Sequence, residues 1–93
     1  MAKEPVLTEK ELEDGLRELS GWSVEEGKMV KKYVFPSFAE SIAFVNKVAD
    51  IAERMNHHPF ISVDYRRVTL RLTTWHSGGI TALDLASARA YDN

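Results

Sequence analysis

The sequence predicts an α+β fold of two layers, a four-stranded, mainly antiparallel sheet with helices packed on one face, in the order α-β-β-α-β-β-α. Three observations predict it. Capping-box spacings occur at three places along the chain. Two pairs of short segments alternate apolar and polar residues. A glycine, a proline or two consecutive arginines lie at the boundaries of these segments. The 93 residues fit one domain, which we assign to residues 1–93.

The first third of the chain predicts a helix followed by two strands. Thr8 and Glu11 have capping-box spacing, and Gly21 is well placed to end the helix. Residues 22–35 then alternate imperfectly around a turn at Glu26-Gly27, which indicates a hairpin. The helix presents one apolar stripe, formed by Leu12, Leu16 and Leu19.

The middle of the chain predicts a long amphipathic helix that ends near Met55. Pro36 stops the preceding strand, and Ser37 with Glu40 supplies a second capping box. Asn56 suits the left-handed conformation that often ends a helix. We expect the core to receive an apolar stripe with steps of four and three, formed by Phe38, Ile42, Val45, Ala49 and Ala52.

The last third predicts a second hairpin and a final helix. Two alternating segments flank Arg66-Arg67, and each is expected to bury one face: Ile61, Val63 and Tyr65 in the first, Val68, Leu70 and Leu72 in the second. Trp22 and Tyr65 are expected in the core or the sheet. Thr81 and Asp84 supply the third capping box, so a capping role for Asp84 is at least as well supported as a catalytic one.

Composition excludes several classes of function. The chain has 12 basic and 14 acidic residues, so no basic surplus exists to drive direct binding of nucleic acid. It has no cysteine, which excludes disulfides, thiolate metal ligands and a cysteine nucleophile. No run of 18 apolar residues occurs and the first residues are polar, so we expect a cytoplasmic protein without membrane contact.

All three histidines lie between residues 53 and 76. Glu53 and His57 are four residues apart near the end of the long helix, so they are expected to share a face. His58 precedes Pro59, which disfavours helical backbone and makes the residue extended. We therefore expect both imidazoles to line one mouth, with the end of the strand carrying Trp75 at its edge.

This spacing resembles a known family. The pattern Glu53-x3-His57-His58-Pro59-x5-Tyr65-x9-Trp75-x8-Asp84 is similar to the signature of the pterin-4a-carbinolamine dehydratases. The dipeptide Gly-Trp at 21–22, the motif FPSF at 35–38 and the motif GGITxxD at 78–84 also resemble that family. The resemblance covers nearly the whole chain, from about residue 20 to residue 91.

The resemblance implies a hydro-lyase that removes water from a 4a-hydroxytetrahydropterin and gives the quinonoid dihydropterin. It implies no metal and no cofactor, a homodimer or homotetramer, and, as in animal members, a possible regulatory protein partner. It places His57 and His58 at the catalytic histidine positions and Glu53 at the acidic position that supports them. The positions that match pterin contacts are Asn56, Thr73, Thr74, Trp75 and His76.

The sequence departs from the family pattern at one position, where Trp75 replaces a third active-site histidine. An indole donates one hydrogen bond and exchanges no proton near neutral pH, whereas imidazole, with a pKa of about 6.5, serves as acid or base. In a regular strand His76 would face away from Trp75 and would not substitute for it. We therefore expect His57 and His58 to carry the acid–base chemistry, with Trp75 positioning the ring.

Two other interpretations stay open from the sequence. Glu53, His57 and His76 offer ligands that suit zinc or iron, which would make a metal site. Alternatively, the chain is a non-catalytic module that dimerises or binds a regulator through an edge strand or its last helix. In that case Trp75 would mark a lost active site.

Overall fold

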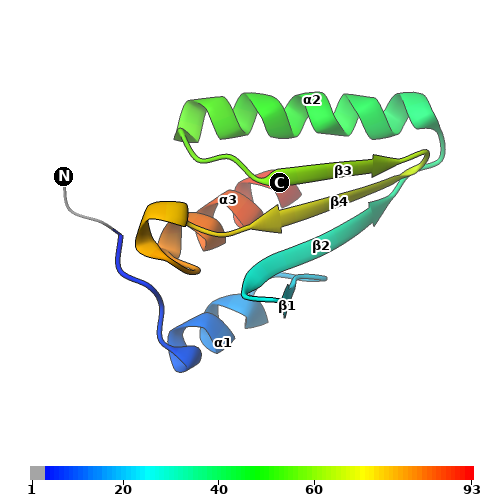
Figure 1. Cartoon of the computed structure of the whole chain (residues 1–93). Coiled ribbons are helices and arrows are strands. Elements are labelled where there is room, and N and C mark those ends of the chain that lie inside the picture. Colours follow the sequence, from blue (N-terminus) through cyan, green and yellow to red (C-terminus); the bar gives the residue numbers. More distant parts are fainter. Residues whose placement is uncertain (1–3) are drawn as a thin grey trace.

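The computed structural model describes residues 4–93 and has the predicted α+β fold (Figure 1). The four strands form one antiparallel sheet in the order β1-β2-β4-β3. The predicted order of helices and strands is confirmed, with one short 3-10 turn added. The elements are α1 (Glu9–Arg17), β1 (Ser23–Glu25), β2 (Lys28–Val34), α2 (Phe38–Met55), β3 (Phe60–Asp64), β4 (Arg67–Leu72), the 3-10 turn η1 (Trp75–Ser77) and α3 (Ala82–Asp92).

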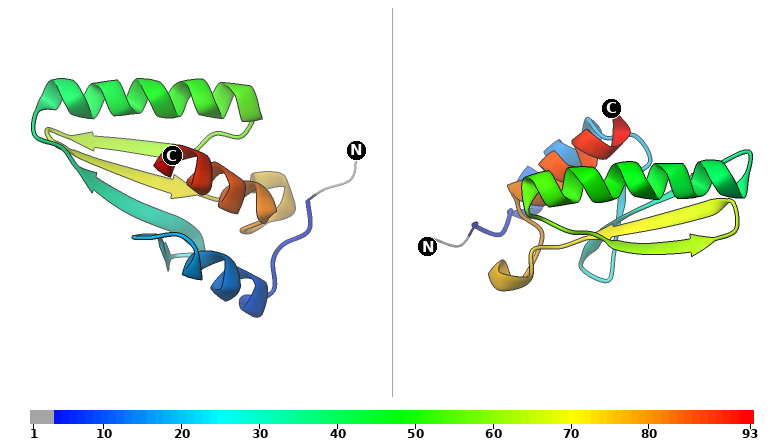
Figure 2. Two further views of the ribbon diagram at one scale, coloured as in Figure 1. Left: turned by 180° about the vertical axis from the view of Figure 1, so that it is seen from behind. Right: turned by 90° about the horizontal axis from the view of Figure 1, so that it is seen from above.

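The helices pack on one face of the sheet, which Figure 2 shows most clearly from above. The cross-strand pairs Met29–Leu72 and Lys31–Leu70 place alternate side chains of β2 and β4 on this face. The core forms where they meet the helices, and its fully buried members include Met29, Val48, Val68, Leu70, Leu72 and Ala88. Within residues 4–93, the helices are all too short or too polar to cross a membrane.

Capping residues begin and end the helices as predicted, except at the end of α1. Thr8 and Thr81 each form a complete capping box, as predicted. The predicted second box is only half formed, because the Ser37 side chain accepts a hydrogen bond from the Glu40 amide while the Glu40 carboxylate accepts from the Ser37 hydroxyl. The first helix ends at Arg17, before Gly21, because the chain needs the intervening turn to bring Trp22 into the core, where it is 6% exposed. The prediction of a core position for Trp22 is confirmed.

The buried face of α2 differs from the predicted one. Ser41, Val48, Ile51 and Ala52 are buried, whereas Phe38 is 51% exposed and Ala49 is also exposed. The predicted stripe therefore overlaps the buried surface only in part: Ala52 is buried and Val45 packs against the core, whereas Phe38 and Ala49 lie outside it. The sequence pattern is ambiguous because the helix carries apolar residues over more than one face, and packing against β4 selects among them.

The second hairpin also differs from its prediction. All residues of β3 are exposed, because β3 is the edge strand and helix α2 covers it incompletely. The turn falls at Tyr65-Arg66, where Tyr65 has a positive φ of 54° and is 65% exposed. The prediction that Tyr65 lies in the core or the sheet is therefore wrong. By contrast, β4 buries one face as expected, through Val68, Leu70 and Leu72.

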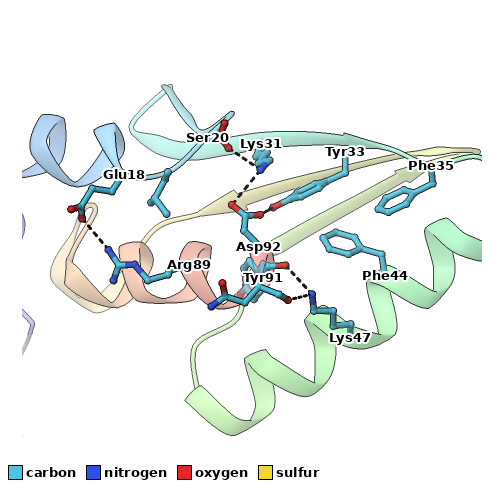
Figure 3. A pocket seen from close by; sticks show the side chains of 12 residues that line it. Glu18, Ser20, Lys31, Tyr33, Phe35, Phe44, Lys47, Arg89, Tyr91 and Asp92 are labelled. Carbon is cyan, nitrogen blue, oxygen red and sulfur yellow. Dashed lines mark hydrogen bonds and ion pairs between the residues drawn. The ribbon is translucent and has the colours of Figure 1, made fainter.

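The end of α3 is tied to the first hairpin through one carboxylate, shown in Figure 3. Asp92 accepts hydrogen bonds from the Trp22 indole (2.9 Å), the Lys31 ammonium (3.2 Å) and the Tyr33 hydroxyl (2.7 Å). Burial and the neighbouring carboxylate raise the pKa of Tyr33 well above its ordinary value, so its hydroxyl stays protonated and donates. These bonds hold α3 against β2, and α3 supplies residues of the site described below.

Replacing Asp92 by alanine is expected to lower the free energy of unfolding by about 1–3 kcal/mol, because three donors lose their acceptor. Urea unfolding followed by circular dichroism measures this change. The exposed Asp50, on the solvent side of α2, gives the matched control, and its alanine variant should stay within about 0.5 kcal/mol of the parent. Equal stability of the two variants would show that the carboxylate does not hold the helix.

Candidate active site

The two adjacent histidines lie where α2 ends, and the backbone there separates their side chains. Asn56 adopts the left-handed conformation (φ 51°, ψ 41°), as predicted, and the His57 amide donates to the Ala52 carbonyl at 3.1 Å. The chain then extends through His58 and Pro59 into β3. This reversal turns one imidazole into the protein and leaves the other at the surface.

His57 is buried and bonded to a buried carboxylate. Its Nε2 lies 2.6 Å from Oδ1 of Asp84, and the two side chains are 8% and 0% exposed. The second oxygen of Asp84 accepts from the Thr74 hydroxyl and from the Thr81 amide, both at 2.9 Å. One carboxylate at the start of α3 therefore joins the end of α2 to the segment after β4, and it fixes the orientation of the His57 ring.

His58 has a carboxylate partner of its own at the surface. Its Nε2 lies 2.5 Å from Oε2 of Glu53, and the two side chains are 55% and 76% exposed. The sequence predicts that Glu53 shares a helix face with His57, whereas the structure bonds its carboxylate to His58. The helix ends at Met55, so the reversal at Asn56 carries His57 inward and brings His58 beside Glu53.

The segment after β4 forms a compact turn rather than a continued strand. The Thr74 carbonyl accepts from the amides of Ser77 and Gly78, and η1 includes Trp75 and His76. The strand geometry expected for these two residues is therefore wrong, since the chain has left the sheet at Leu72. Trp75 is 76% exposed, and its ring meets the ring of Phe60 edge-on, with centroids 6.2 Å apart.

A cavity of about 310 Å³ opens beside this turn, with Thr73, Thr74 and Trp75 among its lining residues. Gly78 and Gly79 complete that side, and the turn between β1 and β2 forms the facing wall. Neither histidine lines this cavity, and His57 is connected to it only through Asp84 and Thr74, so the single mouth expected from the sequence is not formed. A larger cavity of about 560 Å³, beside Asp92 and Tyr33, is lined by residues other than the predicted site (Figure 3).

The positions of the predicted site residues follow from these contacts. Thr74 lines the cavity and donates to Asp84, so it connects the cavity to the Asp84–His57 pair. Asn56 ends α2 through its left-handed backbone, and the His76 side chain is exposed in η1. Two residues of the candidate site were not assigned to it from the sequence. Phe60 contacts Trp75, and Asp84 both caps α3 and binds His57. The capping-box spacing identified the first function of Asp84 but carries no signal for the second.

The metal-site interpretation is contradicted by the arrangement of side chains. Residues 4–93 contain no group of three histidine, cysteine, aspartate or glutamate side chains placed to hold a metal ion. Glu53 is bonded to His58, His57 is bonded to Asp84, and His76 belongs to η1. Glu53, His57 and His76 therefore do not form the predicted ligand set.

Comparisons with known proteins agree with this fold. Residues 5–93 match the family model described as pterin 4 alpha carbinolamine dehydratase. A relative from Sulfurisphaera tokodaii is 43% identical over 92% of both chains, and one from Thermomicrobium roseum is 50% identical over 80% of both. Both are provisionally named pterin-4-alpha-carbinolamine dehydratases.

Solved structures give the same result. A crystal structure described as a transcriptional coactivator/pterin dehydratase from Brucella melitensis superposes with a TM-score of 0.89 at 34% identity, covering 94% of this chain and 95% of the other. A pterin dehydratase-like RuBisCO assembly factor of the alpha-carboxysome, 24% identical with a TM-score of 0.62 over 76% of this chain and 82% of its own, shares the fold. The chain therefore belongs to the pterin 4 alpha carbinolamine dehydratase family.

Proposed function

We propose that the protein dehydrates a 4a-hydroxytetrahydropterin by histidine acid–base catalysis. In this reaction the N5 proton leaves, a double bond forms between N5 and C4a, and the 4a-hydroxyl departs as water after gaining a proton. The products are a quinonoid dihydropterin and water. The observation that carries the proposal is the presence of two adjacent imidazoles, each bonded to its own carboxylate, of which the His57–Asp84 pair is joined through Thr74 to a cavity lined by an exposed indole.

His58 is the acid that protonates the departing hydroxyl. Its ring is accessible, and the Glu53 carboxylate bonded to its Nε2 holds the imidazole in one orientation. An imidazole titrates close to neutral pH, so it is able to return to the protonated form after each turnover. Positioned proton transfer of this kind typically contributes about 10²- to 10⁴-fold to a rate.

His57 is the base that accepts the N5 proton. When Asp84 accepts the Nε2 proton, Nδ1 is left with the lone pair, which gives the ring one defined basic nitrogen. Protonation of His57 then forms an ion pair with a carboxylate that Thr74 and Thr81 already hold in place. Because this carboxylate is already oriented, less free energy is needed to place the positive charge of His57 beside the substrate.

Trp75 positions the flat pterin ring, and its neighbours complete the binding site. An exposed indole offers a face for stacking, and Phe60 supports its edge. Thr73 and Thr74 line the cavity and offer polar groups to the heterocycle. We assign supporting substrate contacts to Asn56, which ends α2 beside the two histidines, and to His76, which follows Trp75 in η1.

The test is to generate 4a-hydroxytetrahydropterin in situ and follow its loss by absorbance, with and without the protein. We expect the protein to accelerate this loss well above the spontaneous rate, at protein concentrations far below that of the pterin. An unchanged rate would reject the enzyme and leave a non-catalytic module of the same family, for which the replacement of a histidine by Trp75 marks the lost activity.

A further inference from the structure

The turn between β1 and β2 contains a residue whose backbone conformation does not suit its side chain. Glu25 pairs with Lys28, so Glu26 and Gly27 form a two-residue turn, and both have positive φ values, 51° and 76°. Turns of this kind favour asparagine or aspartate followed by glycine. A glutamate in the left-handed region is uncommon and costs free energy, so its presence at this position calls for another explanation.

The same turn lines the cavity of the proposed active site. Glu26, Gly27 and Lys28 form the wall that faces Thr73, Thr74 and Trp75. The Lys28 ammonium lies 5.9 Å from the centre of the Phe60 ring, which in turn contacts Trp75. Through Phe60, these contacts connect the turn to the exposed indole that lines the same cavity.

The Glu26 carboxylate is available to a ligand. It is exposed, and among residues 4–93 it takes part in no ion pair. The preceding Glu25 belongs to β1 and is not part of the cavity lining. Glu25 and Glu26 therefore carry the same charge and are both exposed, but only Glu26 lines the cavity.

We propose that Glu26 is a specificity-determining residue that binds the pyrimidine end of the pterin, an inference that rests on the proposed function. A pterin carries two neighbouring donors there, the 2-amino group and N3–H. A carboxylate accepts both at once through its two oxygens, and such charge-assisted pairs are stronger than neutral ones. With Glu26 at this end and Trp75 on its face, the ring is held by groups that take no part in proton transfer.

The first test compares Glu26→Gln with the matched control Glu25→Gln in the dehydration assay. Glutamine keeps the size of the side chain but loses the charge and one acceptor. We expect Glu26→Gln to raise KM about 10- to 100-fold with kcat unchanged, because the contact holds substrate and transition state alike. Glu25→Gln should keep the parent values. A parent-like KM in Glu26→Gln, in an enzyme that is active, would overturn the inference.

A second substrate tests the chemistry of the contact. A pterin analogue with a methyl group in place of the 2-amino group should be a poorer substrate for the parent, by about tenfold or more in KM, because the Glu26 carboxylate loses one of its two donors. Glu26→Gln should discriminate far less between the two compounds. Equal discrimination by parent and variant would assign recognition of the amino group to another residue.

Glu26→Asn separates binding from the structure of the turn. Asparagine tolerates the left-handed region, so this variant should have a higher melting temperature than the parent while its KM rises. A raised melting temperature with unchanged KM would make Glu26 a turn residue only. Calorimetric binding of 7,8-dihydropterin to each variant separates this inference from the proposed function. Binding that depends on Glu26 in a protein without dehydratase activity would reject the reaction and retain the contact.

Discussion

Replacing Asp84 by alanine is expected to lower the free energy of unfolding by about 3–5 kcal/mol and to abolish most of the activity. Asp84 is fully buried and serves His57, Thr74 and Thr81 together, so its removal leaves three buried groups without their acceptor. The same change frees the His57 ring from its fixed orientation. Denaturant unfolding measures the stability, and the dehydration assay measures kcat.

Asp50→Ala again provides the control, since it removes an exposed aspartate and should change neither property. Asp84→Asn refines the result, because asparagine retains one oxygen for the cap but offers no carboxylate to His57. We expect this variant to be more stable than Asp84→Ala yet still strongly impaired in kcat. Full activity in Asp84→Asn would show that the carboxylate acts only as a helix cap.

The second large effect is expected at His58. Replacing it by alanine should lower kcat about 10²- to 10⁴-fold, because the substitution removes the proposed acid for the departing hydroxyl. The side chain is more than half exposed, so its removal should change the free energy of unfolding by less than about 0.5 kcal/mol. Kinetics of the in-situ assay, with circular dichroism of the same sample, measure both quantities.

His76→Ala is the matched control, since it removes an exposed imidazole from η1, outside both carboxylate–imidazole pairs. We expect a far smaller loss of kcat than for His58→Ala. Equal losses in the two variants would make His76 a catalytic residue and would mean that η1 turns this ring toward the substrate.

Local signals in the sequence predicted most of the fold. The start of α2 was predicted because a proline stops the preceding strand and Ser37 caps the helix, and its end because Asn56 suits a left-handed conformation. The hairpin pairs β1–β2 and β3–β4 were predicted because alternating segments flank a turn signal, whereas the central β2–β4 pair was not specified. Each of these signals depends on residues within about five positions of one another along the chain. Over such short separations, backbone preferences and capping hydrogen bonds largely determine the local conformation.

Features that depend on distant residues were missed. The buried face of α2 and the exposure of β3 are determined by how far one helix covers the sheet, which the alternation of β3 does not encode. At the site, the resemblance gave both histidines and Glu53 as their supporting carboxylate, but not the Asp84 partner of His57. His57 meets Asp84, 27 positions away, and His58 meets Glu53 only because the helix ends between them.

The exposure of β3 has a consequence for how this chain behaves at high concentration. The strand carries one charged residue, Asp64, while Phe60, Ile61 and Val63 are each about 40% exposed. An edge with so few charges offers open amides and carbonyls to any other strand, which is the usual starting point of aggregation. A lysine at residue 61 or 63 is therefore expected to reduce self-association of the chain through this edge of the sheet.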